Sequence, residues 1–222
     1  MQEVIILRAY SGKPKKLLHG RGVVPYNYMV NECPFYRRWR SLMDRCYSKT
    51  VQDKRPTYKG CEVCEEWWVF VNFKTWMEAQ DWQDKDLDKD ILSFELSTNK
   101  YSPETSAFID RKLNSFFTLR QNHRGDYPLG VTYQKRGNKN YVARLNYPLG
   151  RKTLGYYTTP EEAHKQWQIA KHAYGVELMN QQTDVRVKEA LRKILDNLQY
   201  QIDNDLITES LLTPIDTSTQ IP

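Results

Sequence analysis

The stretch "GVTYQKRGNKNYVARLNYPLGRKTLGYYTT", residues 130–159, is the most informative part of this chain for its fold class. Apolar and polar residues alternate along it, and turns that contain Gly or Asn divide it into three runs, 130–139, 140–150 and 151–159. Alternation with a period of two between such turns is typical of short strands joined by tight connections. The stretch therefore predicts a three-stranded antiparallel sheet.

Two helices are predicted after this sheet. Thr159 suits an N-cap and Pro160 the first turn, and the glutamates that follow lie near the positive end of the helix dipole. His164 and His172 are expected at the solvent-facing side or rim of this helix. A second amphipathic helix is predicted over 184–202, and its apolar positions recur at helical spacing: Val187, Leu191, Leu195 and Leu198.

The N-terminal half also predicts amphipathic helices. The stretch "PFYRRWRSLMDRCYS", residues 34–48, repeats apolar residues at steps of three and four. Its basic residues fall largely outside that stripe, which indicates either a DNA-facing surface or a solvated helix face: Arg37, Arg38, Arg40 and Arg45. Another helix is expected to begin near Glu65 and to bury a stripe of aromatic residues in a core.

A compact strand–strand–helix unit is predicted between these regions. The stretch "LDKDIL", residues 87–92, frames two aspartates and a lysine with apolar residues, as in a short strand. A second strand is expected at 106–109, and a helix in "DRKLNSFFTLR", residues 110–120. Together with the sheet described above, the chain is therefore expected to have an α+β fold.

Charge and hydropathy narrow the class of protein. No apolar run approaches the roughly 18 residues that a membrane span needs, and no secretion signal is recognised, so the chain is expected in the cytoplasm without a membrane partner. Lys and Arg outnumber Asp and Glu by 13 to 4 in residues 1–60 and by 12 to 4 in 111–180, whereas 61–110 has 4 against 12. Basic segments suit phosphate backbones, and an acidic centre suits a divalent metal.

Residues 30–120 resemble the HNH (ββα-metal) endonucleases, particularly the phage-encoded homing-endonuclease-like group. The likeness is carried by "CPFYRRWRSLMDRCYS", "PTYKGCEVCEEWWVFVNFKTWM", "LDKDIL" and "NKYSPETSAFI" in that order. The resemblance implies that Asp88 and Asn114 are ligands of a Mg²⁺ or Mn²⁺ ion. It also implies that Lys89 stands where the family has its general-base histidine, and Thr105 where it has the asparagine that orients that histidine.

These departures leave the question of catalysis open. A lysine is normally protonated at neutral pH and is a poor general base, whereas histidine titrates near neutrality. Either Lys89 neutralises charge in the transition state while metal-bound water attacks, or the site has lost its activity. Asn99, Lys100 and Glu104 lie close in sequence and are candidates for the missing function.

Residues 128–178 resemble the DNA-binding domain of plant ethylene-response factors, through "GVTY", "NYVARL" and "LGYYTTPEEA". The resemblance implies a sheet in the major groove with the helix packed on its back. Strand alternation then directs Tyr141, Ala143 and Leu145 toward the helix. Val142 is expected on the other face, together with the candidate DNA-binding residues: Thr132, Gln134, Arg136, Lys139, Asn140, Arg144, Asn146, Arg151 and Thr153. A small structural sheet with basic edges is the alternative.

The cysteines have two interpretations. Without a secretion signal they are expected to be reduced thiols or zinc ligands rather than disulfides. The chain holds one C-x-x-C pair, and buried thiols commonly act as small hydrophobic groups. The candidate zinc ligands are Cys33, Cys46, Cys61 and Cys64.

The expected organisation has five parts: a basic arm at 1–30, a divergent HNH-like domain at 31–122, the DNA-binding domain at 128–180, a helix at 184–202 and a flexible tail at 203–222. The function expected is DNA binding, with or without metal-dependent hydrolysis of phosphodiester bonds. One alternative is an inactive HNH scaffold that acts on DNA or on a host defence or metabolic protein. Another is an RNA- or ribosome-associated protein. Double-stranded DNA, a host protein or RNA are accordingly the candidate partners.

Overall fold

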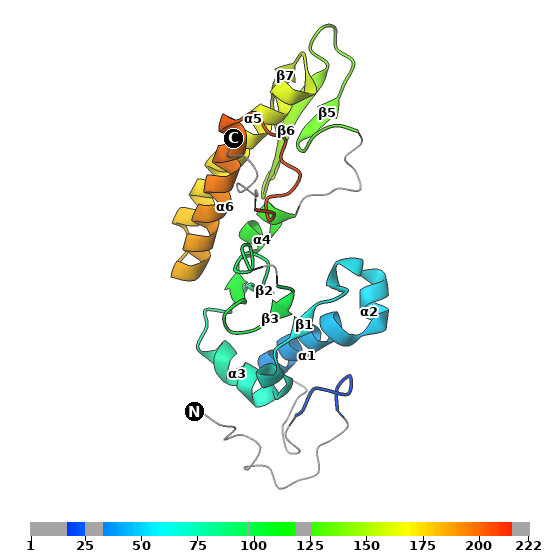
Figure 1. Cartoon of the computed structure of the whole chain (residues 1–222), viewed down its shortest axis with the longest axis vertical. Helices are drawn as coiled ribbons and strands as arrows, with labels where there is room; N and C mark the ends of the chain where they lie inside the picture. Colours follow the sequence, from blue (N-terminus) through cyan, green and yellow to red (C-terminus); the bar gives the residue numbers. More distant parts are fainter. Residues whose placement is uncertain (1–16, 25–32, 97, 119–125, 215–222) are drawn as a thin grey trace, which may run out of the picture. The chain divides into compact units, whose positions relative to one another are not determined.

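Figure 1 shows the fold of the chain as a computed structural model, which describes residues 17–24, 33–96, 98–118 and 126–214. The predicted α+β class is confirmed. The chain divides into two compact units. The first contains residues 1–89 and 98–108, and the second contains 90–97 and 109–222. Most of the expected basic arm lies outside the described residues.

The first unit is built from short elements around an aromatic core. Its elements are α1 (Pro34–Tyr47), α2 (Lys49–Lys54), η1 (Pro56–Tyr58), β1 (Glu62–Val63), η2 (Glu65–Trp68), α3 (Phe70–Glu78), β2 (Asp86–Asp88), β3 (Lys100–Tyr101) and most of β4 (Ala107–Ile109). Trp39, Trp67, Phe70 and Phe73 are fully buried in this core. The indole Nε1 of Trp39 donates to the carbonyl of Trp67 over 2.7 Å, so burial of this ring leaves no unpaired donor.

Two pairs of strands join distant segments of the first unit. Strands β1 and β3 pair in parallel, with Val63 opposite Tyr101, and β2 pairs with β4. The predicted strand at 106–109 corresponds to β4. The stretch 87–92 differs, because the strand ends at Asp88 and residues 90–96 form turns. Ile91 and Phe94 are buried there, so the apolar residues of this stretch anchor turns rather than extend a strand.

The second unit contains the predicted three-stranded antiparallel sheet, which is confirmed. Its strands are β5 (Val131–Tyr133), β6 (Tyr141–Tyr147) and β7 (Gly150–Tyr157), in the order β5-β6-β7. Ala143 pairs with Gly155 whereas Arg144 pairs with Thr153, so Leu154 is an extra residue in β7. Such a β-bulge shifts the alternation by one position, so the residues after it face the opposite side of the sheet from the one that strict alternation predicts.

Helix α5 (Pro160–Asn180) covers one face of this sheet and begins where the sequence predicts. Thr159 and Glu162 form a capping box, in which each side chain pairs with the other residue's backbone. Ala163 of α5 packs against Val131 and Ala143, and Leu154 contacts the same cluster. In Figure 1, α5 runs alongside β6 and β7.

Two further helices pack with α5. They are α4 (Arg111–Phe117) and α6 (Val185–Asp203). The apolar stripe predicted for α6 is buried: Val187, Leu191, Leu195 and Leu198. Gly175 permits a close approach to α6, because a Cβ at this position would lie 2.4 Å from Cδ2 of Leu195. Asp184 caps α6 by accepting from the backbone of Arg186.

The segment after α6 differs from the predicted flexible tail. Thr208 and Leu211 are buried, and the backbone N–H of Thr208 donates to Nε2 of His164 over 3.0 Å. His164 is therefore a buried residue rather than the rim residue expected from sequence. Its Nδ1 carries the proton and donates to the carbonyl of Leu129 over 2.8 Å, since Nε2 acts as the acceptor. The polar composition of the segment after α6 suggested a flexible tail, because composition does not show which distant residues the segment contacts. Residues 215–222 lie outside the described part of the chain.

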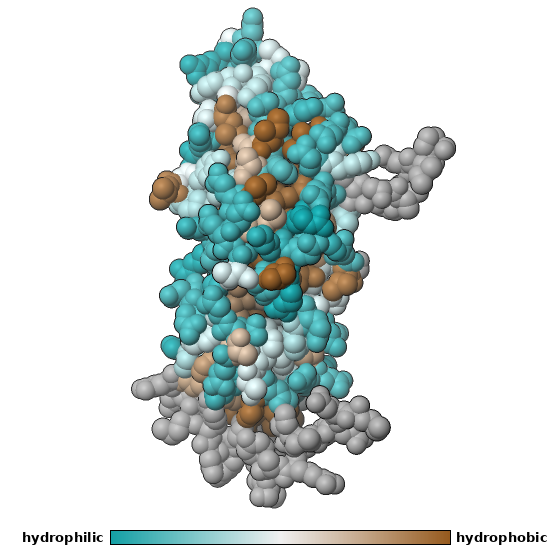
Figure 2. Space-filling model, turned by 90° about the vertical axis from the view of Figure 1, so that its left-hand side faces the viewer, coloured by the Kyte–Doolittle hydropathy of each residue, from teal (hydrophilic) through white to brown (hydrophobic). Residues whose placement is uncertain are grey.

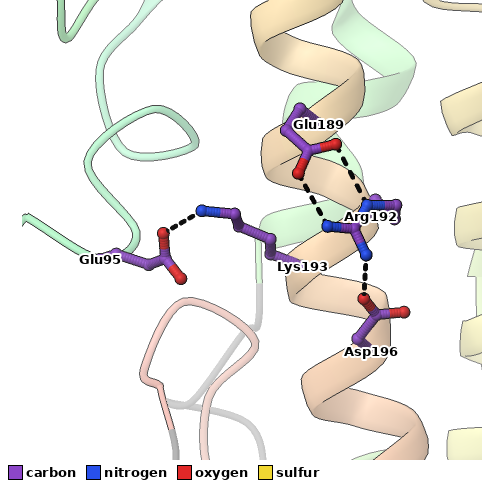
Figure 3. A network of polar contacts seen from close by, with 5 residues as sticks. All are labelled: Glu95, Glu189, Arg192, Lys193 and Asp196. Atoms are coloured by element: carbon purple, nitrogen blue, oxygen red, sulfur yellow. Dashed lines mark hydrogen bonds and ion pairs between the residues drawn. The ribbon is translucent and has the colours of Figure 1, made fainter.

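Ion pairs and hydrophilic residues cover the surface. In Figure 3, Lys193 on α6 reaches Glu95, and Arg192 pairs with both Glu189 and Asp196. Such exposed pairs contribute little to stability. Figure 2 shows a face on which hydrophilic residues prevail and hydrophobic ones form small groups. No helix among the described residues has the length and apolar character needed to cross a membrane.

Candidate nucleic-acid interface

The outer face of the sheet, defined as the face opposite α5, gathers most of the residues predicted to contact DNA. Residues paired across an antiparallel ladder place their side chains on the same face. The register puts Thr132 beside Val142, and Val142 beside Tyr156. Beyond the bulge, Arg144 pairs with Thr153 and Asn146 with Arg151. Residues from all three strands therefore share one surface.

Arg144 lies across this face in a fixed orientation. Its Nη1 donates to Oγ1 of Thr132 over 3.1 Å, and its Nη2 donates to Oε1 of Gln134 over 3.3 Å. An arginine has five N–H donors, and these contacts use two of them. Both partners are neutral, so they orient the guanidinium without cancelling its charge.

A second arginine lies toward the other end of β6. Nε of Arg151 donates to Oδ1 of Asn146 over 3.2 Å, and both residues are exposed. This contact uses the single donor on the inner nitrogen of the guanidinium and not the donors on its two terminal nitrogens. Terminal amino groups are the ones that form bidentate contacts with phosphates or with a guanine edge.

The turn between β5 and β6 forms an open groove of about 520 Å³. The residues that line it are Arg136, Gly137, Asn138, Lys139 and Tyr156. The guanidinium carbon of Arg136 lies 4.6 Å from the ring centroid of Tyr156, a cation–π contact. Oδ1 of Asn140 accepts from the backbone N–H of Arg136 over 2.6 Å, so Asn140 holds the turn in shape. For the predicted DNA contact, Asn140 keeps its amide nitrogen and one of the two acceptor positions of Oδ1.

Val142 belongs to the outer face but is fully buried. Its ladder neighbours are Thr132 and Tyr156, so this face has a buried apolar residue at its centre. Sequence alternation placed Val142 on the correct face without indicating that it is buried.

Tyr156 was not predicted as part of the site. Strict alternation from Thr153 would place Tyr157 on the outer face, but Leu154 inserts an extra residue. Tyr157 consequently packs with the cluster under α5, and Tyr156 supports Arg136. Nothing in the local sequence marks the bulge except the neighbouring Gly155, a residue type that often accompanies bulges.

The residues of the predicted metal site divide between the two units. Asp88 ends β2 and Lys89 follows it in the first unit, whereas Asn114 lies on α4 in the second. Lys89 is buried, and its ammonium nitrogen lies 5.7 Å from the ring centroid of Tyr101. This cation–π contact gives Lys89 a packing role in the first unit.

Thr105 stabilises a loop in the first unit. Its hydroxyl donates to the carbonyl of Lys100 over 2.6 Å and accepts from the backbone N–H of Ser102 over 3.1 Å. Both contacts are local to the segment that joins β3 to β4. Glu104, a candidate substitute for the missing base, accepts from the Ser102 hydroxyl over 2.6 Å.

The four cysteines occupy separate roles in the first unit. Cys33 is the N-cap of α1, and the Cys61 thiol donates to Oδ1 of Asn99 over 3.3 Å. Burial raises the pKa of the Cys46 thiol to about 12, and burial also raises the pKa of Cys64. Across residues 17–24, 33–96, 98–118 and 126–214, no three His, Cys, Asp or Glu side chains form a group that could hold a metal ion. The predicted zinc and magnesium sites therefore remain predictions from sequence.

The basic surface of α1 extends further than the sequence indicated. Arg37, Arg40 and Arg45 line a groove together with Lys54 and Arg55, two residues that were not predicted as part of a site. The sequence signal for this extension was the pair of adjacent basic residues at the end of α2.

Comparison of the chain with protein-family models, with curated proteins and with solved structures found no match.

Proposed function

We propose that this protein binds double-stranded DNA through the outer face of its three-stranded sheet. The observation that carries the proposal is the arrangement of Arg144 and Arg151, each held by a neutral side chain on a neighbouring strand. Guanidinium groups presented in this way suit bidentate contacts with phosphates and with guanine edges. The resemblance of residues 128–178 to the ethylene-response-factor domain supports the same face.

The charge of this face favours a binding surface over a purely structural sheet. In the part of the chain that the structure describes, no carboxylate lies within 4.0 Å of the basic groups of Arg136, Arg144 or Arg151. Solvated protein surfaces usually intersperse charges of both signs. A face that keeps three arginines unneutralised attracts an anionic partner, and its affinity falls steeply with salt concentration.

The test is the affinity of the full chain for duplex DNA, measured by fluorescence anisotropy. We expect Arg144→Ala/Arg151→Ala to weaken binding by more than tenfold, because each bidentate contact contributes about 1–3 kcal/mol. The matched control is Lys188→Ala/Arg192→Ala, which removes the same charge from the exposed side of α6. Equal affinities of the two variants would refute the proposed interface. Tighter binding of RNA than of DNA by the unmodified chain would favour the RNA-associated alternative.

A second candidate function is metal-dependent cleavage of DNA by an HNH-like unit. The observation that favours it is the order of elements, since β2 pairs with β4, α4 follows, and Asp88 stands at the end of β2. A Mg²⁺ ion would supply Lewis-acid chemistry, and the resemblance to the HNH endonucleases implies Asp88 and Asn114 as its protein ligands. Lys89, packed on Tyr101, would contribute positive charge next to Asp88.

Plasmid nicking separates this candidate from binding alone. Nicking that requires Mg²⁺ or Mn²⁺ and that disappears in both Asp88→Ala and Asn114→Ala, but persists in Asp84→Ala, would establish an enzyme. Asp84 is an exposed residue of the same acidic segment, so it controls for general loss of charge. Inert protein that still binds DNA would instead indicate an inactive scaffold, which acts on DNA or on a host protein.

A further inference from the structure

A second basic surface lies in the first unit, in a groove of about 420 Å³ between α1 and α2. The residues that line this α1–α2 groove are Arg37, Arg40, Ser41, Asp44, Arg45, Val51, Lys54 and Arg55. Five of these side chains are basic and one is acidic, so the lining has a net charge of +4. The groove belongs to a different unit from the sheet, so its residues are separate from those of the proposed sheet interface.

The two helices are held together by a defined contact. α2 begins almost directly after α1, with only Ser48 between them. The amide nitrogen of Gln52 donates to the carbonyl of Cys46 over 2.6 Å and to that of Arg45 over 3.4 Å. These carbonyls lie at the C-terminal end of α1, where helical partners are lacking. The contact fixes α2 against α1, so Lys54 and Arg55 line the same groove as the arginines of α1.

The single carboxylate of the groove is already engaged. Oδ1 of Asp44 lies 2.6 Å from Nε2 of His19, and Oδ2 lies 3.8 Å from Nε of Arg40. For Arg37, Lys54 and Arg55, all exposed, no carboxylate lies within 4.0 Å among the residues that the structure describes. Asp44 therefore offsets only part of the positive charge.

Arg45 lies deeper than the other cations. Its Nη1 donates to the carbonyl of Leu87 over 3.5 Å, and its guanidinium carbon lies 5.6 Å from the ring centroid of Tyr58. Both contacts are with uncharged groups and orient a partly buried cation, and Asp86 attracts the same guanidinium electrostatically, so its charge is offset only in part. A charge withdrawn from water in this way is stabilised when an anion reaches it. The groove thus combines an oriented inner arginine with exposed outer cations.

We propose that the α1–α2 groove binds the phosphates of a nucleic-acid backbone without reading the bases. Arginine matches phosphate geometry with paired N–H donors, and the spread of five cations along two helices suits more than one phosphate. The lining contains no aromatic ring on which a base could stack and no amide that could recognise a base edge. These features favour a backbone over a free nucleotide, whose base would be left without contacts.

The experiment compares two charge reversals of equal size in the full chain. Arg37→Glu/Arg55→Glu changes the groove, and Lys49→Glu/Lys59→Glu changes exposed residues of the same unit outside it. Binding of a fluorescent 24-base-pair duplex is measured over a range of KCl concentrations. We expect the groove variant to lose more than tenfold in affinity, and the slope of log K against log salt to become shallower by about 2, because two phosphate contacts are lost. The control should lose less than threefold.

The dependence of the affinity loss on the sequence of the duplex provides a second readout. The loss caused by the groove variant should be equal for duplexes of different sequence, whereas Arg144→Ala on the sheet should cause losses that vary with sequence. If the sheet variant binds normally and the groove variant does not, the sheet proposal fails and the groove proposal stands. Equal losses in the groove variant and in the Lys49/Lys59 control would overturn the groove proposal.

Competing sources of phosphate are tested with the same variants. Inorganic triphosphate, ATP and vesicles that contain phosphatidylglycerol are each titrated into wild-type protein and the groove variant. Groove-dependent binding of ATP or vesicles without groove-dependent binding of DNA would overturn the assignment to a nucleic-acid backbone. Circular dichroism and thermal unfolding check that both variants are folded, which is expected because the substituted side chains are exposed.

Discussion

The ammonium group of Lys171 on α5 donates to the backbone carbonyl of Phe116 over 2.5 Å, inside the second unit. The same nitrogen lies 4.0 Å from the centroid of the Phe116 ring. Phe116 is in the last turn of α4, where carbonyl groups lack helical partners. The buried amino group of Lys171 therefore satisfies the end of α4 and joins it to the long helix that covers the sheet.

This contact makes stability depend on pH. Burial lowers the pKa of Lys171 from its ordinary value of 10.5 to about 7. Between these values the unfolded chain binds more protons than the native protein, so the free energy of unfolding should rise with pH. Urea unfolding from pH 7 to 8.5 should show a contribution of about 1 kcal/mol per pH unit, since one proton is linked to unfolding.

Lys171→Met should remove this slope and leave the profile flatter over the same pH range. Lys188→Met, an exposed substitution on α6, serves as the control and should keep the wild-type profile. An unchanged slope in Lys171→Met would show that other groups cause the dependence.

The bulge at Leu154 provides a paired test of the sheet. We expect Tyr156→Leu to weaken DNA binding about two- to fivefold, because the cation–π contact that orients Arg136 contributes about 0.5–1 kcal/mol. Tyr157→Leu alters the neighbouring residue on the face under α5, so it should lower thermal stability and leave DNA affinity unchanged. Anisotropy titrations and thermal unfolding distinguish the two effects. The reverse pattern would contradict the register across the bulge.

The segment after α6 should contribute to stability through Thr208. Its hydroxyl accepts from the Gln168 amide over 2.8 Å and also pairs with Gln201, and all three residues are buried. Thr208→Val leaves these amides with unsatisfied polar atoms, so we expect a loss of about 2–3 kcal/mol in urea unfolding. Thr213→Val, at an exposed position of the same segment, should change stability by less than about 0.5 kcal/mol.

Close packing of α5 on α6 predicts the effect of a single methyl group. A Cβ at position 175 would lie 2.4 Å from Cδ2 of Leu195 and 3.0 Å from the Phe116 ring, so Gly175→Ala should destabilise the chain by about 1–3 kcal/mol. Leu195→Ala removes the closest atom. The double variant should therefore lose less than the sum of the two single losses, and simple additivity would show that the helices do not meet at this residue.

Periodicity and capping were sufficient to predict the elements of the second unit. The alternation of Tyr141, Ala143 and Leu145 predicted the inner face of β6, and Thr159 with Glu162 marked the start of α5. The buried stripe of α6 could also be predicted from the sequence, because a helix packed on one side repeats its apolar residues every three or four positions. These features depend on local backbone geometry and solvent exposure, which neighbouring residues determine.

Features of the candidate sites that depend on distant residues could not be predicted. The segment that holds Asp88 and Lys89 was expected to continue as a strand, yet its apolar residues anchor turns after Asp88. His164 appeared to be a rim residue because its partners, Leu129 and Thr208, are 35 and 44 residues away. Lys54 and Arg55 belong to the α1–α2 groove only because Gln52 holds the two helices together.

Sequence patterns were enough to predict the α+β class, the three-stranded sheet, and a common face for Arg144, Asn146 and Arg151. The folded structure was needed to show that Tyr156 rather than Tyr157 joins that face, because one inserted residue in β7 reverses the alternation. Local periodicity specifies where a side chain points within an element. Hydrogen bonds and packing between elements decide which side chains meet, and they depend on residues far apart in the chain.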